Sequence, residues 1–210
     1  MVTGLLYCAL PLRNLELDDA HLAALDQGSG RESLRFWESP EPVVVLGRSG
    51  SVEKEVVPGV DVPVVRRSSG GGAVVLAPGC LNFSLVLSIE RHPELVDVAA
   101  GYCLILKRIA AALALDGLEP RGASDLAWRD RKVSGNSQRR TRHAILHHGT
   151  LLYEFDPAWM DRYLQLPPRQ PAWRRGRSHR DFVANLPLAA PEIIARIEAA
   201  WMDSGTLALS

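Results

Sequence analysis

The chain has 210 residues, of which 47% are hydrophobic and 23% are charged, and this length supports one large domain with a sizeable core. Its formal net charge of zero argues against general attraction to nucleic acid or to a membrane surface. It has no long apolar run and no basic region before its first apolar residues, so we expect neither a transmembrane span nor a signal peptide. Three cysteines without metal-ligand spacing fit a reducing cytoplasm better than a disulfide framework.

The first third of the chain predicts strands around one helix. Apolar spacing favours a helix over residues 15–27, capped by Asn14 or Asp18. Short apolar or alternating runs predict strands at 5–11, 34–39, 43–46 and 62–65. A loop rich in Gly and Ser, with Arg48 in it, follows the strand at 43–46. This loop is either a second wall of a ligand site or an ordinary connection.

The most unusual stretch comes next: VVRRSSGGGAVVLAPGCLNFSLVLS, residues 64–88. Arg66 and Arg67 lead into three consecutive glycines, and glycine is needed where backbone turns with positive φ or approaches a ligand closely. The guanidinium forks suit a carboxylate or a phosphate. Neither the Walker A spacing nor the dinucleotide-binding spacing is present. Two readings remain open: a backbone-lined site for an anion, or a tight turn with solvated arginines.

The remaining chain predicts a mixture of strands and helices. We expect a hairpin joining 73–76 to 81–88 around residues 77–79. Helices are expected at 97–115, 157–164 and 191–202, and strands at 123–128, 144–148 and 150–155, the last two meeting at Gly149. The Pro- and Arg-rich segment 167–180 is expected to cross the surface. The fold class is therefore α+β: a single domain with a mixed β-sheet and packed helices.

A second constellation surrounds Lys132 in RDRKVSGNSQRR, residues 129–140. Of 24 basic residues only three are lysines, so a lysine among arginines suggests a site that needs a compact, mobile point charge. Ser134 and Gly135 suit a tight turn with several donors, and Asp125 is a candidate partner for Lys132 or for a magnesium ion. The alternative is a solvated turn, because charge runs usually form solvated faces.

Two adjacent histidines lie on the strand predicted at 144–148. Side chains of neighbouring strand residues point to opposite faces, so His147 and His148 are poorly placed to chelate one metal ion. We expect one of them to be packed or hydrogen-bonded and the other to lie near the site. No His–Cys–carboxylate spacing supports a zinc site.

The two constellations together resemble a known family. RRSSGGGAVVLAPGCLNFSL, followed by SDLAWRDRKVSGNSQRRTRHAILHHGTLL, resembles the lipoate–protein ligases of the biotin/lipoate ligase (BPL/LPL) and octanoyltransferase superfamily, and GRSG at 47–50 matches the place of an earlier Gly-Arg element. The resemblance covers nearly the whole chain. It implies one biotin/lipoate-ligase-like catalytic domain over residues 1–210. It also implies a cytoplasmic enzyme that activates lipoate with ATP to lipoyl-AMP and passes the lipoyl group to a carrier lysine.

The resemblance also implies roles for individual residues. Lys132 would be catalytic, bridging the acyl carbonyl and the phosphate in both steps. Nucleotide contacts would come from Arg48, Asp125 and Lys132, and Asp125 would also hold Mg²⁺. The remaining predicted contacts, to substrate, come from Arg66, Arg67, Gly70, Gly71, Gly72, Ala73, Val74, Val75, Ser134, Gly135, His148 and Gly149. Val74, Val75 and Leu76 would border the slot for the acyl chain.

Partners follow from the same resemblance. The carrier would be a lipoyl domain of the dehydrogenase-complex E2 type or a glycine-cleavage H protein, with no nucleic acid and no membrane involved. Many such ligases carry an accessory domain after the catalytic one, and this chain ends at Ser210, so we expect no accessory domain. The enzyme would then use a separate small accessory subunit, or only transfer from a preformed adenylate. Ser124 and Ser49 depart from the usual Asn and aromatic residues of the family.

Two other functions compete with this one. An octanoyl-[acyl carrier protein]:protein octanoyltransferase would need a cysteine nucleophile, and because no cysteine follows Cys103, Cys80 would have to serve. A non-catalytic ligand- or nucleic-acid-binding protein would use the Arg-rich residues 169–180, with Trp173 stacking on bases. We expect this segment instead to cover the acyl or carrier site.

Overall fold

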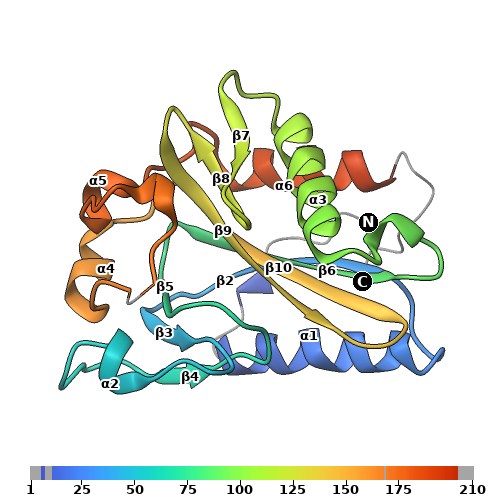
Figure 1. Ribbon diagram of the computed structural model, residues 1–210, viewed down its shortest axis with the longest axis horizontal. Coiled ribbons are helices and arrows are strands. Elements are labelled where there is room, and N and C mark those ends of the chain that lie inside the picture. Colours follow the sequence, from blue (N-terminus) through green and yellow to red (C-terminus); the bar gives the residue numbers. More distant parts are fainter. Residues whose placement is uncertain (1–5, 8–10, 168, 203–210) are drawn as a thin grey trace.

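A seven-stranded sheet organises the molecule, and a three-stranded sheet lies beside one end of it (Figure 1). The computed structural model describes residues 6–7, 11–167 and 169–202. The larger sheet has the order β1-β2-β6-β10-β9-β8-β7 and the smaller one β4-β3-β5. The strands of the larger sheet are β1 (Leu6–Tyr7), β2 (Ser33–Glu38), β6 (Cys80–Ser88), β7 (Leu118–Arg121), β8 (Asp125–Trp128), β9 (Arg131–Arg140) and β10 (Ala144–Leu152). Those of the smaller sheet are β3 (Val43–Leu46), β4 (Val64–Arg66) and β5 (Val74–Leu76).

Helices cover both faces of the larger sheet. α1 lies below it in Figure 1, and α3 and α6 lie above it. Strand β6 is buried on both faces, which is why its sequence is an almost continuous apolar run: Leu85 packs with α3 and α6, whereas Val86 packs with α1. The helices are α1 (Pro11–Asp26), α2 (Val52–Glu55), α3 (Val98–Leu113), α4 (Ala158–Tyr163), α5 (His179–Phe182) and α6 (Ala190–Met202), with 3₁₀ turns at Pro93–Leu95 and Ala172–Arg174.

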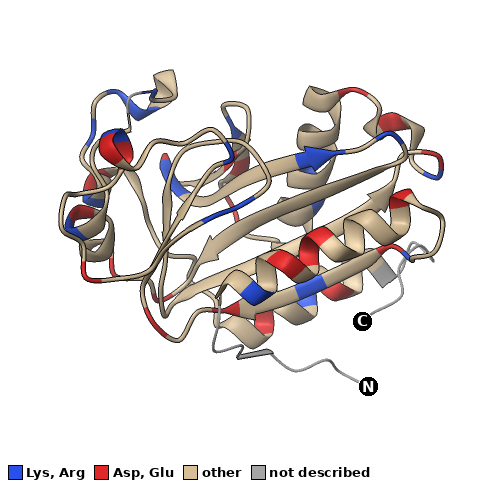
Figure 2. Cartoon of the chain, turned by 90° about the horizontal axis from the view of Figure 1, so that it is seen from below, with Lys and Arg blue, Asp and Glu red and all other residues tan. Residues whose placement is uncertain are grey.

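The fold class and most helices agree with the sequence prediction. The arrangement is α+β, and both sheets are mixed, since β1–β2 and β3–β4 are parallel while the other pairs are antiparallel. α3 starts at an N-cap, Asp97, whose side chain accepts from the Ala100 amide at 2.7 Å. α4 and α6 also lie where they were predicted. The charged residues seen from the α1 side carry both signs (Figure 2), and no described helix is long and apolar enough to span a membrane.

The start of the first helix differs from the prediction. α1 begins at Pro11, so Asn14 and Asp18 lie within the helix and do not cap it. Both are buried, and Arg35 of β2 donates to each of them. Their polar side chains are therefore explained by a buried contact between helix and sheet. Of the strand predicted at 5–11, residues 6–7 form β1, while residues 5 and 8–10 lie outside the described residues.

Two segments predicted as turns or breaks are continuous strands. Residues 131–140 form β9, because their backbone pairs with β8 in its first half and with β10 in its second. β10 likewise runs through Gly149 without a break. The actual turn between β8 and β9 uses Arg129 and Asp130, both with positive φ. The short α2 and β7 were not predicted at all.

The predicted hairpin at 73–88 is wrong, because its two strands belong to different sheets. β5 pairs antiparallel with β3, while β6 pairs with β2 and β10. Gly79 makes the corner between them with φ +84°, and Glu38 accepts a hydrogen bond from its amide at 2.8 Å. A Cβ at Gly79 would overlap the backbone of Glu154. This corner fixes how the two sheets meet.

Replacing Gly79 with alanine is therefore expected to destabilise the fold strongly. The left-handed conformation alone costs about 1–2 kcal/mol for a residue with a Cβ, and the overlap with Glu154 adds to that. Gly59→Ala is the matched control, because Gly59 has φ +75° but open space around its Cα. Denaturant unfolding of both variants measures the difference; equal losses of stability would show that the corner is not sterically tight.

Candidate functional site

A cavity lies where the two central strands of the larger sheet separate. β9 and β10 stay paired only as far as Asn136 and Gly149; beyond this point β9 continues with β8, and β10 continues with β6. Residues of both strands line a cavity of about 390 Å³, a size that suits a small-molecule ligand. The divergence of two neighbouring strands thus opens the interior of the sheet.

The cavity lining combines apolar and polar residues. The apolar wall includes Val74, Val75 and Leu76 of β5, as predicted for an acyl slot, and Trp37, Phe83 and Leu152 from the larger sheet. Of the predicted polar residues, the cavity brings together Arg67, Asp125, Lys132, Ser134 and His148. The predicted Gly71, Gly72, Ala73, Gly135 and Gly149 also line it.

A β-bulge places Lys132 over Gly135 and beside Asp125. Lys132 lies opposite Ala127, and Gly135 lies opposite Asp125, with a register shift between the two pairs. Because Asp125 and Ala127 are two residues apart, they share one face of the sheet, and so do their partners Lys132 and Gly135, although these are three apart. The Lys132 Nζ lies 2.6 Å from Asp125 Oδ1. The bulge therefore gives the cavity an oriented ammonium group.

The polypeptide after α5 closes the gap between the two diverging strands. The Ala184 amide donates to the Lys132 carbonyl on β9 at 2.9 Å, and the Leu186 amide donates to the Leu152 carbonyl on β10 at 2.7 Å. Val183 forms a parallel bridge with Lys132. The backbone of Lys132 is thus held on one side by β8 and on the other by residues 183–186.

Arg67 organises the glycine loop from inside. It is 8% exposed, and its Nη2 donates to the carbonyls of Gly70 at 2.6 Å and Gly72 at 3.0 Å. Its Nε donates to Ser69 Oγ at 3.1 Å, and its Nη1 to the Val45 carbonyl at 3.3 Å. Burial lowers the pKa of Arg67 to about 10, so it remains cationic at neutral pH. Most of its donors are occupied by the protein itself.

Arg66, Arg48 and Gly70 do not line the cavity. Arg66 donates to the carbonyls of Gly47 and Gly50, each at 2.9 Å, and so joins the 47–50 loop to β4. Arg48 is exposed on that loop. The two loops approach so closely that a Cβ at Gly47 would overlap the Gly71 carbonyl oxygen. Direct ligand contacts from these three residues remain predictions.

Glu55 is a site residue that sequence reasoning missed. It lies on α2 and lines the cavity, and its Oε2 accepts from the Ala73 amide at 2.6 Å while its Oε1 accepts from the Ser51 amide at 2.9 Å. From the other side, Ser137 of β9 donates to the Gly70 carbonyl at 2.8 Å. No local pattern links Glu55 to the glycine loop, because the contact spans 18 residues.

The two histidines behave as strand alternation predicts. His148 lines the cavity, with its Nε2 2.5 Å from Ser69 Oγ and its Nδ1 4.0 Å from Asp18 Oδ2. His147 is fully buried on the opposite face, where its Nδ1 lies 3.0 Å from Gln138 Nε2. Burial, with a smaller effect of His148, lowers the pKa of His147 to about 3. His147 is therefore a neutral packed residue, and only His148 faces the site.

Within the described residues, no group of three or more His, Cys, Asp or Glu side chains is placed to hold a metal ion. Asp125 offers a single carboxylate, already paired with Lys132. Mg²⁺ commonly binds through one or two carboxylates together with substrate phosphates, so this donor set fits an ion that arrives with a nucleotide. The magnesium role of Asp125 stays a prediction.

The comparison with known families decides the family of this chain. A family model described as "Lipoyl protein ligase A/B catalytic domain" matches residues 10–198. The chain belongs to this family. The resemblance carried by the glycine loop and the Lys132 segment is thereby confirmed. In a lipoyl protein ligase A/B catalytic domain the cavity described above is the natural candidate for the active site.

Curated relatives support the assignment. The "Putative lipoate-protein ligase A" of Aeropyrum pernix is 34% identical over 155 residues, which is 70% of this chain and 56% of that protein. The "Lipoate-protein ligase A" of Psychrobacter cryohalolentis is 32% identical over 180 residues, 84% of this chain and 50% of that protein. The chain thus spans about half the length of the curated relatives it matches.

Solved structures share the fold. A lipoate-protein ligase A crystallised with ATP has a TM-score of 0.78 at 23% identity, covering 95% of this chain and 83% of that one. A putative lipoate protein ligase of T. acidophilum with bound lipoic acid has the same TM-score at 21% identity, covering 98% and 86%. These likenesses confirm the expected α+β ligase-like fold.

Gly135→Ala is expected to impair the site through Lys132. A Cβ at Gly135 would lie 2.8 Å from Lys132 Nζ and 2.9 Å from its Cε, so the ammonium group must shift from its present position beside Asp125. We expect at least a tenfold loss of activity, equivalent to about 1.4 kcal/mol, with the fold retained. A double-mutant cycle with Lys132→Ala tests whether Gly135→Ala acts by displacing Lys132. In the Lys132→Ala background, Gly135→Ala should reduce activity almost no further, and additive losses of activity would contradict this explanation.

Proposed function

We propose that the protein is a lipoate–protein ligase, which activates lipoate with ATP to lipoyl-AMP and transfers the lipoyl group to a lysine of a lipoyl carrier domain. One observation carries the proposal: a single cavity in a member of this family is lined by the apolar residues of β5, by residues of the glycine loop and by Lys132. A carboxylic acid with an apolar tail needs an apolar surface for the tail and a charged group for the carboxylate within the same cavity.

The first step joins the carboxylate of lipoate to the α-phosphorus of ATP, and pyrophosphate leaves. Negative charge develops around the phosphoryl and carboxyl oxygens, and a preorganised ammonium group stabilises it. Lys132 is suited to this role because the bulge and Asp125 orient it before substrate binds. A compact ammonium on a flexible stem can also follow charge from carboxylate to phosphate, which a guanidinium fork does less easily.

The second step is attack by the carrier lysine on the mixed anhydride. The same Lys132 would stabilise the charge that develops on the carbonyl oxygen and on the departing AMP. The carrier would be a lipoyl domain of the dehydrogenase E2 type or an H protein. A related T. acidophilum structure is described as a bi-partite lipoate protein ligase and its E2 lipoyl domain, which supports a separate accessory subunit here as well. Mg²⁺ would enter with ATP, with Asp125 as the candidate protein ligand.

The structure offers little support for a cysteine acyltransferase. Cys80 lines the cavity but is 1% exposed, and burial raises the pKa of its thiol well above the usual range. The thiolate that a nucleophile needs is therefore disfavoured. Cys103 is exposed on α3 and does not line the cavity, while Cys8 lies outside the described residues.

The nucleic-acid alternative is weakened by the contacts of the Arg-rich segment. Trp173 packs on Phe182 with ring centroids 4.5 Å apart, and the guanidinium carbon of Arg177 lies 5.6 Å from its ring centre, so the indole already has packing partners within the protein. Arg177 donates to the Asp130 carbonyl at 2.7 Å, and Arg180 pairs with Asp161 at 2.6 Å. Residues of the segment line the cavity, which favours its predicted role as a cover.

The test is incubation with lipoate, ATP and Mg²⁺, measuring pyrophosphate release and acylation of a lipoyl carrier domain. We expect Lys132→Ala to reduce carrier acylation by ~100-fold or more while the fold is retained. Lys107→Ala is the control, since Lys107 is an exposed lysine on α3 away from the cavity. If the wild-type protein releases no pyrophosphate and acylates no carrier, even with an accessory subunit present, the ligase assignment fails.

A cysteine-free variant separates the ligase from the cysteine transferase. Replacing Cys8, Cys80 and Cys103 by alanine should leave transfer from preformed lipoyl-AMP intact, because the anhydride is already reactive and an enzyme thiolate adds nothing. The measurement compares lipoyl-AMP with octanoyl-acyl carrier protein as donors, followed by mass spectrometry of the enzyme. A thioester trapped on Cys80, with loss of transfer in Cys80→Ala, would instead identify an octanoyltransferase.

A further inference from the structure

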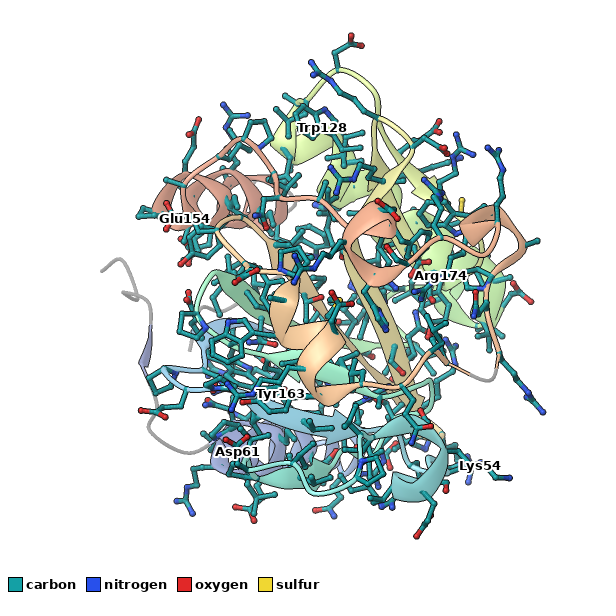
Figure 3. All side chains as sticks on the ribbon, turned by 90° about the vertical axis from the view of Figure 1, so that its left-hand side faces the viewer. Lys54, Asp61, Trp128, Glu154, Tyr163 and Arg174 are labelled. Carbon is teal, nitrogen blue, oxygen red and sulfur yellow. The ribbon has the colours of Figure 1, made fainter. Side chains whose placement is uncertain are left out.

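Arg174 and His179 are buried polar residues of the cavity wall, and each has one side-chain nitrogen without a hydrogen-bond partner among the described residues. Arg174 is 4% exposed and His179 is 8% exposed, and both line the cavity. Within the part of the chain that the structure describes, Arg174 Nη2 and His179 Nε2 have no hydrogen-bond partner. Figure 3 shows the molecule from this end, with Arg174 at mid-height between Trp128 of β8 above and Lys54 of α2 below.

The surroundings of Arg174 hold it in place without neutralising it. Its Nε donates to the Arg177 carbonyl at 2.9 Å, and its guanidinium carbon lies 4.9 Å from the centre of the Phe182 ring. No described carboxylate forms an ion pair with it. Burial, and the like charge of Arg177, lower the pKa of Arg174, while burial and the charge of Arg174 lower that of His179. A buried cation without a counter-charge is unfavourable unless a ligand supplies one.

The other buried or half-buried cations of the cavity already have partners within the protein. Lys132 is paired with Asp125, and the donors of Arg67 hold the glycine loop. Arg169 lines the cavity but is exposed to solvent. Arg174 is thus the buried guanidinium of the lining with free donors, and its planar fork matches the spacing of phosphate oxygens.

We propose that Arg174, with His179 beside it, binds the β- and γ-phosphates of ATP and holds the pyrophosphate as it leaves. This proposal rests on the proposed ligase function and names the residue that binds the pyrophosphate released in its first step. In the first step a lipoate oxygen bonds to the α-phosphorus, and the bond from that phosphorus to the bridging oxygen breaks. The electron pair stays on pyrophosphate, whose added charge the guanidinium stabilises. The polyanion also favours the protonated form of His179, whose Nε2 then donates to it.

The proposal separates the two half-reactions. Lipoyl-AMP retains only the α-phosphate, so transfer to the carrier lysine needs no group at the pyrophosphate position. We therefore expect Arg174→Gln to slow pyrophosphate release from lipoate and ATP by ~100-fold or more, and to leave transfer from preformed lipoyl-AMP within about twofold of wild type. Normal transfer also serves as the control for folding of the segment.

Arg175→Gln is the matched control, because the neighbouring guanidinium is 69% exposed and does not line the cavity. It should leave both half-reactions unchanged. Calorimetry with inorganic pyrophosphate and Mg²⁺ gives a readout independent of turnover, with affinity expected to fall at least ~10-fold in Arg174→Gln. Equal losses in both half-reactions, or unchanged adenylation and unchanged pyrophosphate affinity, would overturn the proposal. If the wild-type protein neither forms lipoyl-AMP from lipoate and ATP nor transfers the lipoyl group from preformed lipoyl-AMP, the ligase function is refuted. The calorimetric affinity for pyrophosphate would then still show whether Arg174 binds this anion.

Discussion

The ion pair between Lys132 and Asp125 depends on a single irregularity in β-pairing. In a regular strand, residues three apart face opposite sides, and the Lys132 side chain would then lie on the face away from Gly135. The register shift between β8 and β9 removes that alternation, so the ammonium group crosses Gly135 and reaches Asp125 within the cavity. Bulges commonly re-aim side chains next to active sites, and here the bulge positions the one lysine of the lining.

The two buried arginines of the cavity have different tasks, which follow from their hydrogen bonds. Arg67 donates to four acceptors within the protein, so it shapes the loop that contains Gly70 and Gly72. Arg174 donates through Nε to the Arg177 carbonyl, and its Nη2 has no hydrogen-bond partner among the described residues. Burial alone does not tell these roles apart. The number of N–H donors without a partner distinguishes these roles, because a guanidinium whose donors are all used within the protein cannot donate hydrogen bonds to a ligand.

Local patterns predicted the elements that local physics controls. α3 has an Asp cap and a regular apolar stripe, and the alternation of His147 and His148 follows from strand geometry alone. The prediction for β9 was wrong because its polar side chains resemble a turn, whereas several of them, including Ser134, Asn136 and Ser137, line the cavity. Glu55 carries no local signal, because its contact with the glycine loop joins segments distant in sequence. The Arg-rich composition of residues 169–180 predicted a cover over the site, but it did not single out Arg174 among the arginines.

Residues 183–186 connect the Arg-rich segment 167–180 to the backbone of Lys132, the lysine that the proposed chemistry uses. Residues 183–186 bond to Lys132 on β9 and to Leu152 on β10, where these strands no longer pair with each other. Arg174 and His179 precede Val183 by nine and four residues, and both line the same cavity. Asn185 fixes it further, since its side chain both donates to and accepts from the backbone of Phe155. The proposed ligand contacts at Arg174 and the backbone support of Lys132 therefore belong to one continuous stretch of chain.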